Sequence, residues 1–361
     1  MGITKTETEN NNMSKYYDGT KLLSLMDING QKPEIYMSTS NRSAGKTTYF
    51  NRMLVNRFKK NGDKFILVYR FNYELTECAD KFFKEIGKLF FKGDEMTEKK
   101  HANGIFVELF LNEKSCGYCI SLNFADQLKK YSHLFADASS MLFDEFQSET
   151  NHYCPNEVEK LLSIHTSIAR GGGEQVKYMP VYMISNAVSI INPYYMAMNI
   201  ADRLQKDTKY LRGDGWVLEQ GYYEEVSKKQ TESAFNRAFA GSSYVKYASE
   251  NVYLLDKTCL IEKMQGKSDY VATILMDGKH YAIRNFLDRG VLYVDNSADD
   301  TYRVKFSIIP SEQSDGYELL TTADFMFFTL KNYFLKGKVR FKNQECKSVF
   351  FTLLKFDLYK H

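Results

Sequence analysis

One run of eight residues has the composition of a loop that binds phosphate groups. Gly45, Lys46 and Thr47 match the end of the pattern G-x-x-x-x-G-K-[ST], and Ser40 stands where that pattern has its first glycine. In such a loop backbone N–H groups surround the phosphates, the lysine reaches the β- and γ-phosphates, and the hydroxyl binds Mg²⁺. The predicted loop comprises Ser40, Asn41, Arg42, Ser43, Ala44, Gly45, Lys46 and Thr47, followed by Thr48. The alternative is a chance G-K-T at a turn. A strand before the loop and a helix after it, both expected here, favour the phosphate site.

Two adjacent acids, Asp144 and Glu145, follow the apolar run 141–143. An apolar strand ending in two acids presents them at the carboxyl edge of a sheet, where a phosphate loop also lies. Asp144 would hold Mg²⁺, directly or through water, and Glu145 would orient and deprotonate the attacking water. The alternative is a strand that ends in solvated acids. Together with the loop, the pair predicts a nucleoside-triphosphate hydrolase.

Four further residues are candidates for the same site. Ser185 and Asn186 follow the apolar run 181–184 and could sense the γ-phosphate, or could mark an ordinary strand-to-turn transition. Arg170 precedes three glycines, and Arg42 lies inside the loop itself. An arginine in such a position can reach a neighbouring subunit's nucleotide and stabilise transition-state charge, whereas a solvated surface arginine is the alternative.

The elements that must position these residues follow an alternating pattern from residue 34 to about residue 195. Short apolar runs indicate buried strands, and the segments 48–60, 72–89 and 157–169 read as helices between them. This alternation predicts an α/β fold: a P-loop NTPase of the ASCE type, with a mainly parallel sheet and helices on both faces.

From about residue 252 onward the pattern is strand-like again, and two helical stretches close the chain. At 361 residues the chain is also too long for one core. We therefore expect a second, smaller α+β domain. The predicted boundaries are a disordered tail at 1–20, an ATPase domain at 21–222, a linker or helical lid at 223–247, and a C-terminal domain at 248–361.

Composition excludes several classes of protein. The six cysteines are scattered, which indicates reduced thiols rather than a disulfide framework, and the Cys116-x-x-Cys119 spacing favours a hairpin turn over a zinc site. The segment 180–201 carries no charge, but its three asparagines and its proline argue against a membrane span. The net charge of +3 does not itself indicate a nucleic-acid partner.

A local basic cluster near the C-terminus is a candidate nucleic-acid surface. Basic residues interleaved with aromatic ones can follow a phosphate backbone, and a solvated, alternating strand face is the alternative. The basic residues are Lys336, Lys338, Arg340, Lys342 and Lys347, and the aromatic ones are Tyr333, Phe334 and Phe341.

The order and spacing of these motifs resemble the large-terminase-like DNA-packaging ATPases of small, protein-primed tailed phages of the Picovirinae type. The resemblance extends from about residue 34 to the C-terminus. It rests on the arginine-bearing loop 40–48, on the run 121–130 leading into 142–146, on Ser185-Asn186, and on 233–235 through 244–248.

This resemblance implies a homomeric ring, usually of five subunits, at the portal vertex of a procapsid in the host cytoplasm. It implies ATP- and Mg²⁺-dependent translocation of double-stranded DNA, with the portal or connector as partner and a packaging RNA in some members. Arg170 then looks like an arginine finger acting in trans, and Lys129 or Lys130 could also face a neighbour's nucleotide. No membrane partner is implied.

The C-terminal domain is expected to be an RNase H-like, vestigial nuclease. Larger terminases carry an active nuclease there, but the aspartates of this region lie mostly in turn-like contexts, and only Asp295 follows an apolar strand. Three alternatives stay open at this point. They are a terminase with an active metal-dependent nuclease, another P-loop nucleic-acid motor such as a helicase, and a nucleotide-gated scaffold that does not turn over.

Overall fold

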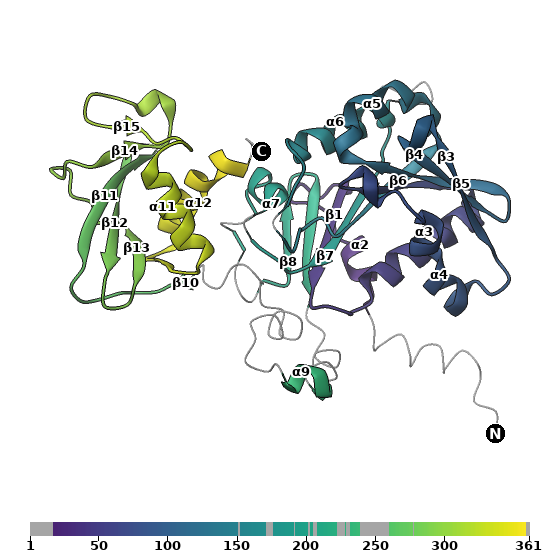
Figure 1. The fold of residues 1–361 in the computed structure, drawn as a ribbon, viewed down its shortest axis with the longest axis horizontal. Helices are drawn as coiled ribbons and strands as arrows, with labels where there is room; N and C mark the ends of the chain where they lie inside the picture. The colour runs from purple at the N-terminus through teal and green to yellow at the C-terminus, as the bar shows by residue number, and fades with distance from the viewer. Residues whose placement is uncertain are drawn as a thin grey trace. The chain divides into compact units, whose positions relative to one another are not determined.

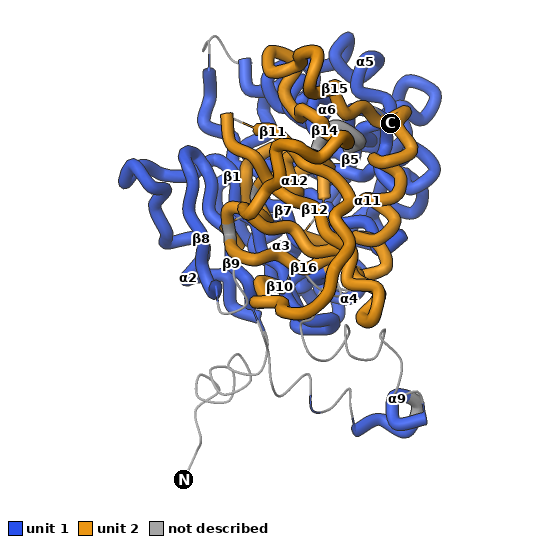
Figure 2. The backbone as a smooth tube through the Cα atoms, turned by 90° about the vertical axis from the view of Figure 1, so that its left-hand side faces the viewer, with its two compact units in different colours: residues 1–187, 206–252 blue, residues 188–205, 253–361 orange. Residues whose placement is uncertain are grey.

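A computed structural model describes residues 17–150, 152–170, 176–190, 192–200, 203–204, 208–221, 228, 232–238, 260–276 and 278–358. The chain forms two compact units (Figure 2). Unit 1 comprises residues 1–187 and 206–252, and unit 2 comprises residues 188–205 and 253–361. The boundaries expected from the sequence assign residues 188–205 to the ATPase domain, whereas the structure groups them with the C-terminal residues. Most of the expected linker, and the motif at 244–248, lie outside the described residues.

Unit 1 is built on a nine-stranded sheet with the order β3-β4-β5-β2-β6-β7-β1-β9-β8. Neighbouring strands along the run β5-β2-β6-β7-β1-β9 are parallel. The outer pairs β3/β4, β4/β5 and β8/β9 are antiparallel. The strands are β1 (Ile35–Ser40), β2 (Lys64–Tyr69), β3 (Met96–His101), β4 (Phe106–Leu111), β5 (Lys114–Ser121), β6 (Ala138–Asp144), β7 (Val181–Asn186), β8 (Tyr210–Gly213) and β9 (Trp216–Gly221). Strand β7 lies between the loop strand β1 and the acid-bearing β6, which is the strand arrangement of ASCE-type P-loop NTPases.

Helices cover both faces of this sheet, as Figure 1 shows for α3 and α4 on one side and for α5 and α6 on the other. The helices are α2 (Thr20–Leu23), α3 (Lys46–Asn61), α4 (Cys78–Phe90), α5 (Ala125–Leu128), α6 (Glu157–Ala169) and α9 (Ala234–Ala238). Short 3-10 helices are η1 (Asn72–Glu74), η2 (Ala102–Gly104), η3 (Leu122–Phe124) and η4 (Lys129–Phe135). The large core cluster joins α3 and α4 to β1, β2, β4 and β5. The mainly parallel α/β sheet predicted from the sequence is confirmed.

Two local predictions for unit 1 were wrong. The single helix expected at 72–89 is divided, because Glu77 adopts a left-handed conformation (φ 54°) between η1 and α4. The Cys116–Cys119 spacing lies inside strand β5 rather than in a hairpin turn. Gly117 occurs there because a Cβ atom at this position would stand 2.4 Å from the carbonyl oxygen of Phe65 on β2. The glycine between the two cysteines therefore allows β5 to pack closely against β2.

Unit 2 contains a seven-stranded sheet with the order β10-β16-β13-β12-β11-β14-β15. The strands are β10 (Leu260–Ile261), β11 (Asp269–Met276), β12 (Lys279–Phe286), β13 (Val291–Asp295), β14 (Lys305–Ser307), β15 (Glu318–Leu319) and β16 (Val339–Phe341). Helices α7 (Pro193–Ala197), α11 (Phe325–Leu335) and α12 (Gln344–Leu358), with η5 (Pro310–Glu312), complete it. The antiparallel meander β11-β12-β13, extended beside β11 by the parallel strands β14 and β15, agrees with the expected RNase H-like α+β domain.

The uncharged segment 180–201 is divided in the structure between strand β7 and the five-residue helix α7. Among the described helices, none is both long enough and apolar enough to cross a membrane.

Candidate functional site: a phosphate loop beside an acidic pair

The loop after β1 has the backbone shape of an anion-binding concavity. Ser43 and Gly45 adopt positive φ angles of 60° and 95°, and Gly45 directly precedes the first residue of α3. Alternation of this kind turns successive N–H groups toward one side, and the helix that follows adds the positive end of its dipole. Glycine suits position 45 because a side chain is strained at that φ.

Lys46 is buried, with 7% of its surface exposed. Its Nζ donates a hydrogen bond to Ser40 Oγ at 2.6 Å. Burial lowers the pKa of this lysine to about 8, while the carboxylates of Asp144 and Glu219 act in the opposite direction. Ser40, the residue that replaces the usual glycine, thus supplies a hydrogen-bond acceptor for the lysine.

The loop and the acidic pair meet at one edge of the sheet. Thr47 Oγ1 donates a hydrogen bond to Asp144 Oδ2 at 2.8 Å, across 97 residues of sequence. Loss of hydration raises the pKa of Asp144 to about 6, whereas the hydrogen bond from Thr47 lowers it. Two hard oxygen donors converge here, which is the ligand chemistry that Mg²⁺ prefers.

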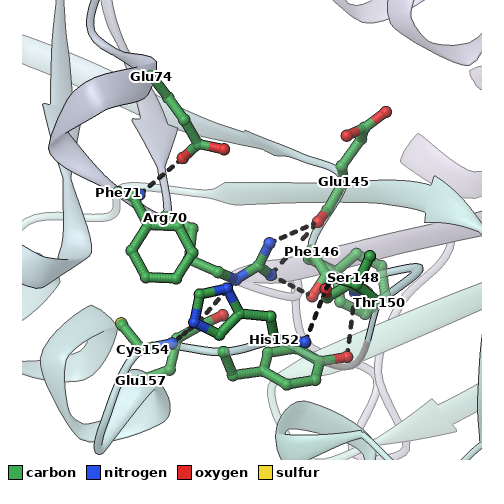
Figure 3. Close-up of polar contacts among 11 residues, drawn as sticks. Arg70, Phe71, Glu74, Glu145, Phe146, Ser148, Thr150, His152, Cys154 and Glu157 are labelled. Carbon is green, nitrogen blue, oxygen red and sulfur yellow. Dashed lines mark hydrogen bonds and ion pairs between the residues drawn. The ribbon is translucent and has the colours of Figure 1, made fainter.

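Glu145 stands in a left-handed conformation (φ 57°) at the end of β6. Its carbonyl oxygen faces Arg70, while its exposed carboxylate points away from that side chain (Figure 3). A left-handed glutamate is uncommon, so local contacts must hold the chain in this shape.

Arg70, just after β2, supplies those contacts. Its Nη2 donates to the Phe146 carbonyl at 2.9 Å, and both terminal nitrogens lie 3.4 Å from the Glu145 carbonyl. Its Nε donates to Glu157 Oε2 at 2.8 Å, and both side chains of this ion pair are buried. Figure 3 shows this cluster of Arg70, the 145–146 backbone and Glu157. Sequence reasoning missed both residues of the pair. A charged residue directly after an apolar strand, as at Arg70, was the available signal.

The strand β7 places Ser185 and Asn186 beside the loop. In the register of the sheet Thr39 faces Ser185 and Ser40 faces Asn186, while Asp144 on β6 faces Ile184. The hydroxyl of Ser185 is buried and has no hydrogen-bond partner within the described part of the chain. Both predicted residues therefore lie at the same edge as the loop and the acidic pair.

The arginine and lysine candidates differ in their surroundings. Arg42 forms an ion pair with Glu149 of the same chain at 3.4 Å. Arg170 caps the C-terminus of α6 and is exposed, and the glycines 171–173 that follow it lie outside the described residues. Lys129 is paired with Asp126 at 3.1 Å.

The basic cluster of unit 2 is only partly a surface. Lys336 and Lys338 are exposed, but Arg340 is largely buried and pairs with Glu262 at 3.3 Å. Lys342 donates to Asn296 Oδ1 at 2.5 Å. Lys347, Phe334 and Phe341 are buried. The interleaved phenylalanines thus belong to the core, where they cannot stack on bases.

Asp295, the acid singled out as a possible metal ligand, is 5% exposed and accepts hydrogen bonds from Arg284 Nε at 2.8 Å and Ser297 N at 2.6 Å. Across the residues that the structure describes, no three His, Cys, Asp or Glu side chains gather as a metal site. Two further aspartates of the C-terminal region, Asp256 and Asp277, lie outside the described residues.

Comparison with known proteins bears on the whole chain. The DNA packaging proteins of Bacillus phages phi29 and PZA are each 25% identical to it over 346 residues, which are 95% of this chain and 98% of each relative. A solved structure described as the bacteriophage phi29 viral genome packaging motor assembly matches with a TM-score of 0.58 and 22% identity, covering 94% of this chain and 99% of that one. The model of the family described as "Podovirus DNA encapsidation protein (Gp16)" matches residues 11–358. The resemblance that the motifs indicated is thereby confirmed, and the chain belongs to the podovirus DNA encapsidation protein (Gp16) family.

Proposed function

We propose that the chain is the ATP-hydrolysing subunit of a motor that translocates double-stranded viral DNA into a procapsid. The observation that carries the proposal is the convergence of Lys46, Thr47 and Asp144 at one sheet edge, next to a left-handed Glu145. The family model and the phage relatives, whose printed names describe DNA packaging, support the same conclusion.

In this proposal each loop residue has a role in binding ATP. The backbone amides of residues 40–47 surround the phosphates, and Lys46 leaves Ser40 to reach the β- and γ-phosphates. Thr47 Oγ1 and Asp144 Oδ2 are the atoms that would hold Mg²⁺, which neutralises phosphate charge when bound. These two oxygen atoms lie 2.8 Å apart, close enough to bind the same ion.

Glu145 is the proposed general base. Its exposed carboxylate accepts a proton from a water molecule as the water oxygen attacks the γ-phosphorus and the bond to ADP breaks. Asn186, opposite Ser40 in the sheet, and the buried hydroxyl of Ser185 are positioned to detect whether the γ-phosphate is present.

The motor is proposed to be a homomeric ring of five subunits at the portal vertex, acting in the host cytoplasm, in some cases with a packaging RNA. Arg170, exposed at the end of α6, completes a neighbour's site. In unit 2, Lys336 and Lys338 are the basic candidates best exposed to contact DNA phosphates without reading sequence.

The proposal is tested by ATP turnover of the full chain, with and without DNA and procapsids. Wild-type protein should show turnover that DNA and procapsids stimulate, and Lys46→Ala should abolish it. Turnover that survives in Lys46→Ala would disprove the site. Strand separation of a forked duplex would instead favour a helicase, and metal-dependent cleavage of plasmid DNA would favour an active nuclease.

A further inference from the structure

The phosphate loop is held from outside by a residue near the N-terminus. The backbone N–H of Tyr17 donates a hydrogen bond to the carbonyl oxygen of Ala44 at 2.8 Å. In a planar trans peptide the carbonyl and the next N–H point in opposite directions. Because the Ala44 carbonyl is turned toward Tyr17, the N–H of Gly45 is turned away from it. Tyr17 therefore fixes the orientation of one of the amides that line the loop.

Tyr17 is itself fixed by its side chain. Its hydroxyl donates to Glu219 Oε2 at 2.8 Å, across 202 residues of sequence. Its ring packs against two residues of α3, edge-on to Tyr49 at 5.4 Å between centroids and tilted against Phe50 at 5.9 Å. Since α3 begins directly after the loop, the same tyrosine contacts the loop, its helix and strand β9.

Glu219 is 3% exposed, and the side chains that donate hydrogen bonds to its carboxylate are hydroxyl groups. Besides the bond from Tyr17, Tyr210 donates to Oε1 at 3.0 Å and Ser38 to Oε2 at 3.4 Å. Within the described residues it has no ion pair with a lysine or arginine side chain. A buried carboxylate is costly unless such donors satisfy it, so its hydroxyl partners are held firmly.

We propose that Tyr17 and Glu219 are positioning residues for nucleotide binding. Glu219 anchors the Tyr17 side chain, and the Tyr17 amide holds the Ala44–Gly45 peptide in the orientation that presents the Gly45 N–H to a phosphate. The inference rests on the proposed ATP site and adds two residues to it that touch neither nucleotide nor metal. Their loss weakens nucleotide affinity and leaves the hydrolytic step unchanged.

Tyr210 provides a matched control for Tyr17. Tyr17→Phe and Tyr210→Phe each remove one hydroxyl from the same carboxylate, but only Tyr17 touches the loop. With the full chain and a fluorescent ATP analogue, we expect Tyr17→Phe to raise Kd about tenfold, as for a lost hydrogen bond to a charged group. Its kcat should stay within about twofold of wild type, and Tyr210→Phe should stay within about twofold in Kd by the same measure.

A second measurement does not depend on activity. Hydrogen exchange of the peptide that contains residues 41–47 should be faster in nucleotide-free Tyr17→Phe than in wild type, and unchanged in Tyr210→Phe. Equal effects of the two variants on Kd, or unchanged exchange in Tyr17→Phe, would overturn the positioning role.

Lys46→Ala serves as the reference: if it binds the analogue normally, the ATP site itself is wrong. If it loses binding while Tyr17→Phe binds normally, only the inference on Tyr17 and Glu219 fails.

Discussion

Thr47 Oγ1 donates a 2.8 Å hydrogen bond to Asp144 Oδ2, and this bond joins the phosphate loop to the acidic pair. The two residues lie on α3 and β6, elements that only the folded sheet brings together. Thr47 and Asp144 are also the two residues proposed to hold Mg²⁺, so this bond places their oxygens side by side.

Asp144→Asn tests the metal role. The amide keeps the shape of the side chain but removes the negative charge, so ATP turnover should fall on the order of 10²-fold or more. The matched control is Asp80→Asn on α4, an exposed aspartate that pairs with Lys84. The control should retain wild-type turnover, measured by phosphate release across a magnesium titration. An Asp144→Asn protein with an unchanged magnesium dependence would contradict the assignment.

Arg70→Gln tests the support of Glu145. The substitution removes the cation that pairs with the buried Glu157 carboxylate, which should lower the free energy of unfolding by about 3–5 kcal/mol, measured in urea. The double variant Arg70→Met, Glu157→Leu removes both charges, so it should recover much of that stability. It should still hydrolyse ATP slowly, since the hydrogen bonds from Arg70 to the Glu145 and Phe146 carbonyls are then lost. Recovery of full turnover together with stability would show that Arg70 is purely structural.

Gly117→Ala tests the packing of β5 against β2. The added methyl group would meet the Phe65 carbonyl at 2.4 Å, so the strands must separate, and the loss of stability should be about 1–3 kcal/mol. Gly316→Ala is the control, because its nearest atom is Lys305 Nζ at 3.7 Å. Thermal unfolding of both variants checks this. An unchanged melting temperature for Gly117→Ala would mean that the close approach is absent.

Arg170 is tested by mixing two inactive proteins. Lys46→Ala lacks a working loop but retains Arg170, and Arg170→Ala has the reverse defect. If Arg170 acts in trans in a head-to-tail ring, an equimolar mixture should restore activity at roughly a quarter of the interfaces. If the mixture stays inactive while each variant still assembles, the trans role is ruled out.

The sequence predicted those parts of the site that local pattern determines. The strand, loop and helix around residues 40–47 follow from a glycine, a lysine and apolar spacing, and helix α6 has the predicted bounds of 157–169. The split of the helix expected at 72–89 was not predictable, because it depends on one left-handed residue, Glu77.

Contacts between distant residues account for the rest. Arg70 and Glu157 are 87 residues apart, and Tyr17 and Glu219 are 202 apart. A single sequence contains no signal that pairs residues so far apart along the chain. The packing of other elements against the sheet brings each pair together: Glu157 begins helix α6, and Tyr17 precedes helix α2.

Glu145→Gln tests most directly whether the chain hydrolyses ATP with Glu145 as the general base. The amide cannot accept the proton from water, yet the phosphate loop, Thr47 and Asp144 stay intact. The decisive measurement is single-turnover hydrolysis of ATP by the full chain in the presence of DNA, alongside the affinity for ATP. If Glu145 is the general base, the variant should bind ATP nearly as tightly as wild type, with hydrolysis slowed by about 10²–10⁴-fold. Hydrolysis at the wild-type rate by Glu145→Gln would contradict it.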